Sequence, residues 1–305
     1  MKIPKKDGSL RTIHNPDGRM RSVQYKLLTK LFNKLQLPEY VYAFEKNRNI
    51  PEMAAKHIGK HCIISLDIKD FFPSIKQHTL NDIMTRLNIG EQAARTISEL
   101  VTYKAFVPQG ALTSPKISNL VTSVTFGPEI EVYCRENNFV LTVYADDVTV
   151  STDNKQVQPR QVINELTAII QNHGFKINKK KTKVMFKGQR QYVCGAVVNA
   201  KVNLIVKERK RLRAITHNIV ANGIEPEASK MGKQPAEFLN YVRGRLNWFR
   251  QLNPALGQKY FDKLKTYLLS LKAKAAQEAE TALLYKAYME EIDRTLLEEP
   301  ASLPF

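Results

Sequence analysis

Three aspartates carry the clearest chemical signal in this sequence. Asp67 follows the apolar run at residues 62–66, and Asp146 and Asp147 stand together between two β-rich runs later in the chain. Burying carboxylates is costly unless cations balance their charge. Hard oxygen ligands select Mg²⁺, and two such ions can stabilise the attacking and leaving oxygens of an in-line displacement at phosphorus. Asp146 and Asp147 alone are equally consistent with a simple turn, but together with Asp67 they predict a two-metal site for nucleotidyl transfer.

The charge of the chain indicates a polyanionic partner. Its 305 residues include 47 Lys and Arg against 29 Asp and Glu, a formal net charge of +18. Residues 173–213 hold thirteen Lys or Arg and one acid, Glu208, whereas the residues from Lys274 onward hold seven acids and three bases. A merely solvated surface would mix the two signs more evenly, so this segregation favours nucleic acid as the partner.

Composition narrows the class of protein further. Hydrophobic residues make up 43% of the chain, and no apolar run approaches the roughly 20 residues that a membrane span needs. The first residues, MKIPKKDGSL, have no apolar segment of the kind found in a secretory signal. The three cysteines are isolated, which fits neither a zinc site nor a disulfide framework. We therefore expect a cytoplasmic protein with reduced cysteines and no membrane contact.

Hydrophobic periodicity and turn residues predict the elements that must position the three acids. Residues 62–66 should form a buried strand that leads into Asp67, and residues 139–152 a hairpin with Asp146 and Asp147 at its tip. Further strands are expected at residues 10–14, 182–186, 192–198 and 202–206, and helices at residues 23–35, 73–87, 91–101, 114–136, 161–173 and 207–297. This order predicts an α+β core followed by a separate helical lobe.

Three segments resemble, in the correct order, the A, B and C motifs of reverse transcriptases: LDIKDFFPSI at residues 66–75, PQGALTSP at 108–115 and YADD at 144–147. The basic opening segment also resembles the fingers of these enzymes, residues 174–182 resemble motif D, and residues 192–199 resemble the primer grip. The resemblance implies an α+β right-hand polymerase with an antiparallel-sheet palm. The implied divisions are fingers at 1–60 and 79–105, palm at 61–78 and 106–206, and a helical thumb with an acidic tail at 207–305.

Within that family the sequence looks most like the bacterial retron enzymes. Ala54 and His57 match part of the retron-specific Asn-Ala-x-x-His element, although Met53 stands in place of its Asn. Residues 193–195 resemble the retron Val-Thr-Gly triplet, with Cys194 in place of the Thr. The Gln-Gly pair at 109–110 differs from the Ser-Gln pair usual in diversity-generating elements, which disfavours that lineage.

The resemblance assigns roles to individual residues. Asp67, Asp146 and Asp147 would hold two Mg²⁺ ions, with Mn²⁺ as an alternative. Lys181 would act as the general acid that donates a proton to the departing pyrophosphate. An equally good interpretation is that Lys181 only contacts the phosphate backbone. Phe72 would be the steric gate that rejects a ribose 2′ hydroxyl, or else a core residue packed beside Phe71. The other residues expected to bind the nucleotide are Arg11, with Lys5 and Lys6 behind it, and Asp70, Gln109 and Gly110.

The expected partners are a structured non-coding template RNA, its DNA product and deoxynucleoside triphosphates, together with a candidate effector protein of the same antiphage defence system. The residues predicted to contact RNA or DNA are His57, Lys207, Arg209, Lys210, Arg211, Arg213, Arg243 and Arg245. Phe72 and Ala145 disfavour an RNA-dependent RNA polymerase. Two alternatives stay open: a defence-associated or abortive-infection reverse transcriptase of another lineage, and a non-catalytic RNA-binding palm protein.

Overall fold

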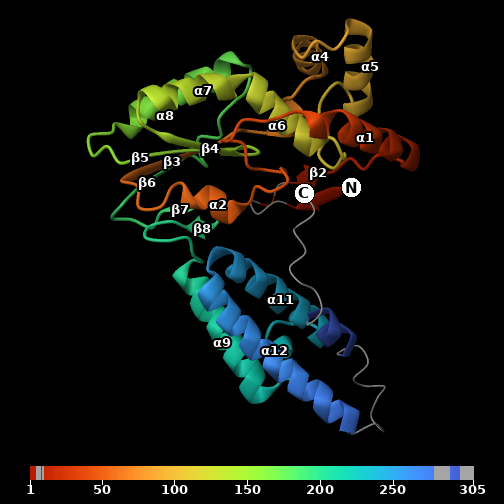
Figure 1. The fold of residues 1–305 in the computed structure, drawn as a ribbon, viewed down its shortest axis with the longest axis vertical. Helices are drawn as coiled ribbons and strands as arrows, with labels where there is room; N and C mark the ends of the chain where they lie inside the picture. Colours follow the sequence, from red (N-terminus) through yellow and green to blue (C-terminus); the bar gives the residue numbers. More distant parts are fainter. Residues whose placement is uncertain (5–7, 9, 278–288, 296–305) are drawn as a thin grey trace. The chain divides into compact units, whose positions relative to one another are not determined.

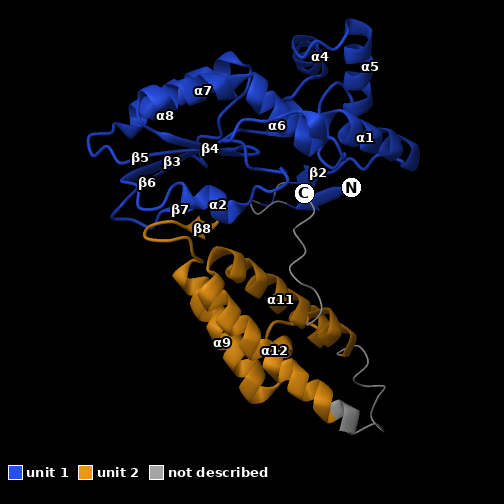
Figure 2. Ribbon diagram, in the orientation of Figure 1, with its two compact units in different colours: residues 1–194 blue, residues 195–305 orange. Residues whose placement is uncertain are grey.

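The chain forms two compact units, Met1–Cys194 and Gly195–Phe305, coloured separately in Figure 2. The computed structural model describes residues 1–4, 8, 10–277 and 289–295. Unit 1 combines helices with an antiparallel sheet, and unit 2 is built mainly of helices (Figure 1). The predicted α+β class is therefore confirmed. Among the described residues, no helix is both long enough and apolar enough to cross a membrane.

A four-stranded antiparallel sheet lies at the centre of unit 1. Its order is β4 (Val140–Tyr144), β5 (Asp147–Thr152), β3 (Cys62–Asp67) and β6 (Lys183–Phe186). The predicted strand at 62–66 and the predicted hairpin at 139–152 are both present. Because β4 pairs only with β5 in this sheet, β4 is an edge strand, whereas β3 and β5 are paired on both sides.

The two faces of the sheet differ because side chains alternate along each strand. On one face, Ile64, Leu66, Val148 and Val150 are buried in the main hydrophobic cluster. Helices from the middle of the chain add to that cluster: α6 (Ser114–Val124), α7 (Phe126–Glu136) and α8 (Pro159–Asn172). Figure 1 shows α7 and α8 running along this side of the sheet.

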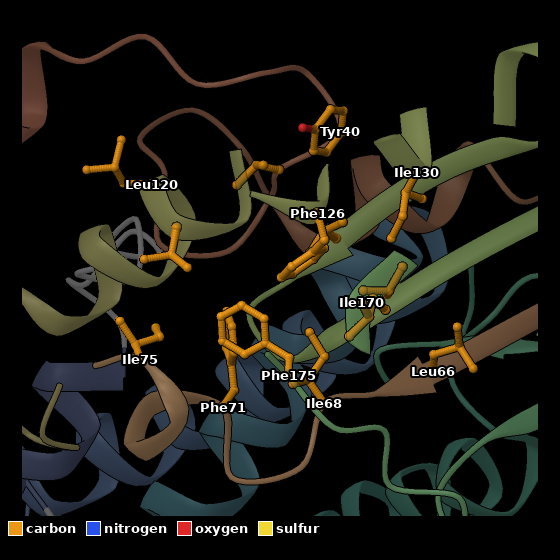
Figure 3. Packing of buried hydrophobic residues seen from close by; sticks show 14 of the residues in the cluster. Tyr40, Leu66, Ile68, Phe71, Ile75, Leu120, Phe126, Ile130, Ile170 and Phe175 are labelled. Atoms are coloured by element: carbon orange, nitrogen blue, oxygen red, sulfur yellow. The ribbon is translucent and has the colours of Figure 1, made fainter. Parts of the chain in front are cut away.

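Three phenylalanines join the centre of this core (Figure 3). Phe71, Phe126 and Phe175 meet edge to face, with ring centroids 5.4 to 6.4 Å apart. Such geometry suits the charge distribution of aromatic rings. Phe71 directly precedes Phe72 in motif A, so the core holds the backbone of that motif in place.

Helices α6 and α7 replace the single helix predicted over residues 114–136. Thr125, between them, has φ −107° and ψ −107°, outside helical geometry. Pro128 explains the break, because it has no N–H to donate to the carbonyl of Val124 and its ring would clash with that carbonyl. Gly127 allows a close crossing there, since a Cβ at this position would lie 2.4 Å from the carbonyl oxygen of Thr122.

Short strands and helices make up the rest of unit 1. Strands β1 (Lys2–Pro4) and β2 (Leu10–Thr12) pair antiparallel, and α1 (Gly18–Lys30) and a 3₁₀ turn, η1 (Phe32–Lys34), take the place of the helix predicted at 23–35. Asp17 fixes the start of α1, because its Oδ1 accepts a hydrogen bond from the backbone N–H of Met20 at 2.8 Å. The remaining helices are α2 (Ile50–Ala55), α3 (Phe71–Ser74), α4 (Gln77–Arg86) and α5 (Glu91–Val101).

Unit 2 begins at the turn between β7 (Tyr192–Val193) and β8 (Ala196–Val197). The strand predicted at residues 202–206 does not form; Asn203 makes one bridge to Val197, and the next helix starts at Val206. Buried side chains such as Leu212, Phe238 and Phe249 form the core of this unit. Its main helices are α9 (Val206–Asn222), α10 (Ile224–Lys230), α11 (Pro235–Leu252) and α12 (Pro254–Gln277).

Candidate active site

The register of the sheet brings the three predicted acids together. Asp67 ends β3 directly opposite Asp147, which begins β5. Asp146 lies in the preceding turn, where Ala145 adopts a positive φ of 53°, and the carbonyl of Asp146 accepts a hydrogen bond from the N–H of Ile68 at 2.8 Å. The backbone of the turn is thus fixed to the residue after Asp67. Acids far apart in the sequence therefore occupy one end of two neighbouring strands.

The segment predicted to be motif D packs against the same end of the sheet. The backbone N–H of Asn178 donates to the carbonyl of Asp67 at 2.7 Å, and the N–H of Lys69 donates to the carbonyl of Lys176 at 2.7 Å. Through this contact the Nζ atom of Lys181 reaches Oδ2 of Asp67, at 2.8 Å. Among the three lysines at 179–181, Lys181 is therefore the one that the fold brings to the acids.

The acids are crowded and partly shielded from water, and their protonation equilibria reflect both effects. Burial raises the pKa of Asp147 to about 6, and the negative charges of Asp146 and Asp67 add to that rise. Burial also raises the pKa of Asp146, whereas the positive charges of Lys181 and Arg11 oppose the rise. The pKa of Lys181 is raised by its hydrogen bond to Asp67. A cluster with this excess of negative charge favours the approach of cations.

Carboxylate oxygens of this kind are the donors that Mg²⁺ prefers. In the part of the chain that the structure describes, no three His, Cys, Asp or Glu side chains are arranged as a preformed metal site. One oxygen of Asp67 faces Lys181 instead. The carboxylate oxygens of the three aspartates are thus of the chemical type that binds a hard cation. Lys181 supplies part of the positive charge that balances these carboxylates.

Motif A supplies two residues beside the acids. Asp70 has a left-handed backbone conformation, with φ 46° and ψ 45°, and stands at the start of α3. Phe71 is buried, whereas Phe72 is only half-buried and packs against the edge of the core, with its ring centroid 6.1 Å from that of Phe71. Of the two rings, Phe72 is the one that retains an accessible surface. Its role as a steric gate stays a prediction.

Motif B is tied to the chain's opening segment. The N–H of His14 donates to the carbonyl of Gln109 at 2.7 Å, and Gly110 has a positive φ of 109°. A Cβ on Gly110 would lie 2.6 Å from Cγ2 of Ile13 and 2.9 Å from the carbonyl oxygen of His14. The glycine therefore permits a close approach of the chain's own residues. The predicted contact of Gly110 with the nucleotide stays a prediction.

The N-terminal cations are only partly described. Arg11 lies on β2, is exposed, and is close enough to influence the pKa of Asp146. This placement is compatible with the predicted contact between Arg11 and a triphosphate. Lys5 and Lys6, expected behind Arg11, lie outside the described residues.

His57 occupies a different environment from the one predicted for it. Its side chain is 0% exposed, and its two ring nitrogens lie within hydrogen-bonding distance of hydroxyl groups on β5 and β4. Burial lowers its pKa to about 4, and the positive charges of Lys60 and Lys56 lower it further. A neutral ring enclosed in unit 1 is not available to RNA, which argues against the predicted RNA contact.

The predicted nucleic-acid-binding cations of unit 2 fall into two groups. Lys207, Lys210, Arg211 and Arg213 are exposed on α9, and Arg209 is half-buried there. Two of the three arginines of α11 are engaged within the unit: Nη2 of Arg245 lies 2.7 Å from Oε1 of Glu208, and Nη1 of Arg243 lies 3.8 Å from Oε1 of Glu291. The pair formed by Arg245 joins α11 to α9. The charges of these two arginines are therefore partly balanced inside the helical unit.

An open hollow of about 840 Å³ lies on unit 2, and we call it the α9–α12 groove. Arg213 and His217 line it from α9, and Lys259 and Lys263 line it from α12. Its other lining residues are Ala214, Asn218, Tyr260, Asp262 and Thr266. His217, Lys259 and Lys263 are not among the residues predicted from the sequence to bind nucleic acid. The available signal was the i, i+4 spacing of basic residues within each helix, which places them on one helical face.

Known proteins resemble the chain over most of its length. The family model described as "Reverse transcriptase (RNA-dependent DNA polymerase)" matches residues 3–241. The Retron Mx65 reverse transcriptase of Myxococcus xanthus is 30% identical over 84% of this chain and 62% of that protein, so the chain spans less than two thirds of that relative. The Retron Ec86 reverse transcriptase of Escherichia coli is 30% identical over 87% of this chain and 78% of that protein.

A solved telomerase from Candida albicans is more distant: 11% identical, with a TM-score of 0.47 over 82% of this chain and 56% of that chain. The family match extends over well more than half of the chain and contains the paired acids, and the retron relatives align with most of it. The chain therefore belongs to the reverse transcriptase family, and within that family it is of the retron type.

Proposed function

We propose that the chain is an RNA-directed DNA polymerase whose reaction takes place at Asp67, Asp146 and Asp147. The observation that carries the proposal is the register pair Asp67–Asp147, with Asp146 in the adjoining turn. Membership of the reverse transcriptase family supports the same assignment. Burial raises the pKa of Asp147 to about 6, and the negative charges of Asp146 and Asp67 add to the rise, so below about that pH the binding of a cation would be accompanied by loss of a proton.

In this proposal the three carboxylates hold two Mg²⁺ ions, or Mn²⁺ in their place. The bound ions supply charge stabilisation for the attacking and leaving oxygens of nucleotidyl transfer. Lys181 holds a proton at Nζ beside Asp67 and donates it to the departing pyrophosphate. Its raised pKa keeps that proton in place at neutral pH until negative charge develops on the leaving group.

The other motif residues would select and orient the deoxynucleoside triphosphate. Arg11 contributes positive charge for the phosphates, and Asp70, Gln109 and Gly110 line the approach to the sugar and base. The accessible ring of Phe72 lies under the sugar and excludes a 2′ hydroxyl. The support for this arrangement is that motif A adjoins the acids in the chain and that Arg11 is within electrostatic reach of Asp146.

The divisions into fingers, palm and thumb follow from the same proposal. Residues 1–60 and 79–105 would be fingers, residues 61–78 and 106–206 palm, and residues 207–305 thumb. The exposed cations of α9 and the basic lining of the α9–α12 groove would contact the phosphate backbone. Phosphate contacts of this kind position a nucleic acid without reading its sequence.

The template, we propose, is a structured non-coding RNA that the enzyme copies into a multicopy single-stranded DNA joined to RNA. The support is that the relatives are retron reverse transcriptases. An effector protein and a role in antiphage defence in the cytoplasm complete the proposal. Sequencing the nucleic acid that copurifies with the protein tests it, because a single RNA species with its covalently joined DNA copy is expected, whereas a mixture of cellular RNAs would oppose it.

The catalytic assignment is tested by primer extension with purified protein, an RNA template and deoxynucleoside triphosphates. The double variant Asp146→Ala/Asp147→Ala should lose DNA synthesis and keep RNA binding. Asp82→Ala, which removes an exposed carboxylate from α4, is the matched control and should extend the primer as the unaltered chain does. Undiminished extension by the double variant would rule out the proposed site.

A further inference from the structure

The face of the sheet that carries the acids also carries a row of hydroxyl side chains. Asp67 pairs with Asp147 and Ser65 with Thr149, so these four side chains share one face with the next alternate residue of β5, Ser151. Thr142 of β4 lies opposite Thr149 and joins the same row. The acids therefore stand at one end of a polar row, and the buried hydroxyls of Thr142 and Ser151 lie further along the hairpin.

His57 bridges those two hydroxyls. Its Nδ1 lies 2.7 Å from Oγ of Ser151, and its Nε2 lies 2.8 Å from Oγ1 of Thr142. Thr142 is 1% exposed and Ser151 is 0% exposed, so water does not replace either bond. Since Thr142 belongs to β4 and Ser151 to β5, one imidazole ring connects the two strands that carry Asp146 in their turn and Asp147 at the start of β5.

The segment that leads to His57 also supports the open edge of β4. The N–H of Tyr42 donates to the carbonyl of Val143 at 2.8 Å, and the N–H of Val143 donates to the carbonyl of Tyr40 at 2.7 Å. Further along this segment, Glu45 forms an ion pair of 2.7 Å with Lys116 of α6. The same stretch of chain thus holds β4 at its edge and, through His57, across its face.

We propose that His57 is a positioning residue, which fixes the β4–β5 hairpin so that Asp146 and Asp147 keep their places beside Asp67. This inference deepens the proposed function and rests on it. The ring does not touch the reacting groups. It acts through the register and twist of the hairpin, because a shift of one strand against the other moves the acids relative to Asp67.

Two kinds of variant remove the bridge. His57→Phe keeps an aromatic ring of similar volume and leaves both hydroxyls without their partner, whereas His57→Gln offers an amide that can restore part of the bonding. The pair Thr142→Val/Ser151→Ala removes the same two hydrogen bonds from the other side. His173→Gln is the matched control, because that histidine bonds Glu129 at 2.7 Å, away from this face of the sheet.

Each full-length variant is assayed well below its own unfolding temperature. The kcat for nucleotide incorporation, the KM for deoxynucleotide and the Kd for a hairpin RNA are measured. His57→Phe and the hydroxyl pair should each lower kcat roughly ten- to a hundredfold, since small misplacements of reacting groups have effects of this size. KM and Kd should change less than about threefold, and His57→Gln should recover part of kcat. If His57→Phe does not fold, the hydroxyl pair decides the result.

Binding of Mn²⁺, followed by electron paramagnetic resonance without substrate, gives a readout separate from activity. The unaltered chain should bind Mn²⁺ more tightly than Asp147→Asn, and the His57→Phe variant should fall between them. If Asp147→Asn binds as tightly as the unaltered chain, the metal assignment of the proposed function fails, and this proposal fails with it. If only Asp147→Asn is weakened, and the bridge variants keep both kcat and Mn²⁺ binding while their melting temperature falls, His57 only stabilises the fold and the positioning role is wrong.

Discussion

The acids of unit 1 and the cations of unit 2 are positioned in different ways. The three acids are few and are held by strand register, backbone hydrogen bonds and a neighbouring lysine. The cations are many, most of those on α9 are exposed, and Arg243 and Arg245 on α11 are engaged in pairs inside the unit. Long side chains on helix surfaces keep their conformational freedom, whereas a carboxylate at the end of a paired strand keeps little.

This difference has a functional consequence. A reaction at phosphorus requires groups placed to within a fraction of an ångström, which the sheet can provide. Binding a phosphate backbone requires positive charge over an area, and exposed lysines and arginines are sufficient for that. We therefore expect unit 1 to respond sharply to small changes in geometry and unit 2 to respond gradually to changes in charge.

The buried histidine of unit 1 gives the largest stability effect. The pKa of His57 is about 4 in the folded chain, against a usual value of about 6.5, so the unfolded chain binds more protons below pH 6.5. The contribution of His57 to the free energy of unfolding is fully present above pH 6.5 and is lost as the pH falls toward 4. The loss should reach about 3 kcal/mol in the free energy of unfolding.

Denaturant unfolding between pH 7 and pH 4 checks this, with His57→Gln as the comparison. The difference between the two curves isolates the histidine and the two lysines near it, Lys56 and Lys60. Asp147, with its pKa raised to about 6, acts in the opposite direction in both proteins, since protonation below that pH favours its folded form. If the free energies of unfolding of the two proteins change in parallel between pH 7 and pH 4, the imidazole of His57 is not buried as described.

The second prediction concerns Phe72, whose ring is the accessible member of its pair. Phe72→Val should raise ribonucleotide incorporation relative to deoxynucleotide incorporation by roughly a hundredfold, because a steric clash with the 2′ hydroxyl is relieved. The ratio of kcat/KM for the two nucleotides is the measurement. Unchanged selectivity together with a lower melting temperature would assign Phe72 to the core.

The third prediction concerns the α9–α12 groove and has the smallest expected effect. Lys259→Glu should weaken binding of an RNA duplex by roughly tenfold at low salt. The slope of the logarithm of affinity against the logarithm of salt concentration should fall by about one, the value expected for the loss of one phosphate contact. Lys265→Glu, on the same helix but outside the groove lining, is the control for net charge. Equal losses for the two variants would show that total charge alone governs binding and that the groove has no special part.

The sequence predicted where the three acids stand, because an apolar run that ends at Asp67 and two β-rich runs around Asp146 and Asp147 indicate a strand end and a hairpin tip. Their catalytic role stays a prediction. It did not predict the environment of His57, since a motif match does not tell whether a polar side chain meets RNA or a buried hydroxyl. The helix break at Thr125 was missed although Pro128 marks it. The groove was missed because His217 and Lys263 are adjacent only after α9 and α12 pack, at 3.4 Å between Nδ1 and Nζ.

The central claim is that nucleotidyl transfer depends on the paired acids of unit 1 and that nucleic-acid binding does not. Single-turnover incorporation of one deoxynucleotide by Asp67→Asn, at saturating RNA, tests this most directly when the Kd for RNA is measured on the same preparation. The rate should fall by at least about a thousandfold, equivalent to about 4 kcal/mol of transition-state stabilisation, while Kd changes by less than about threefold. A preserved rate, or a Kd weakened in proportion to the rate, would contradict the account.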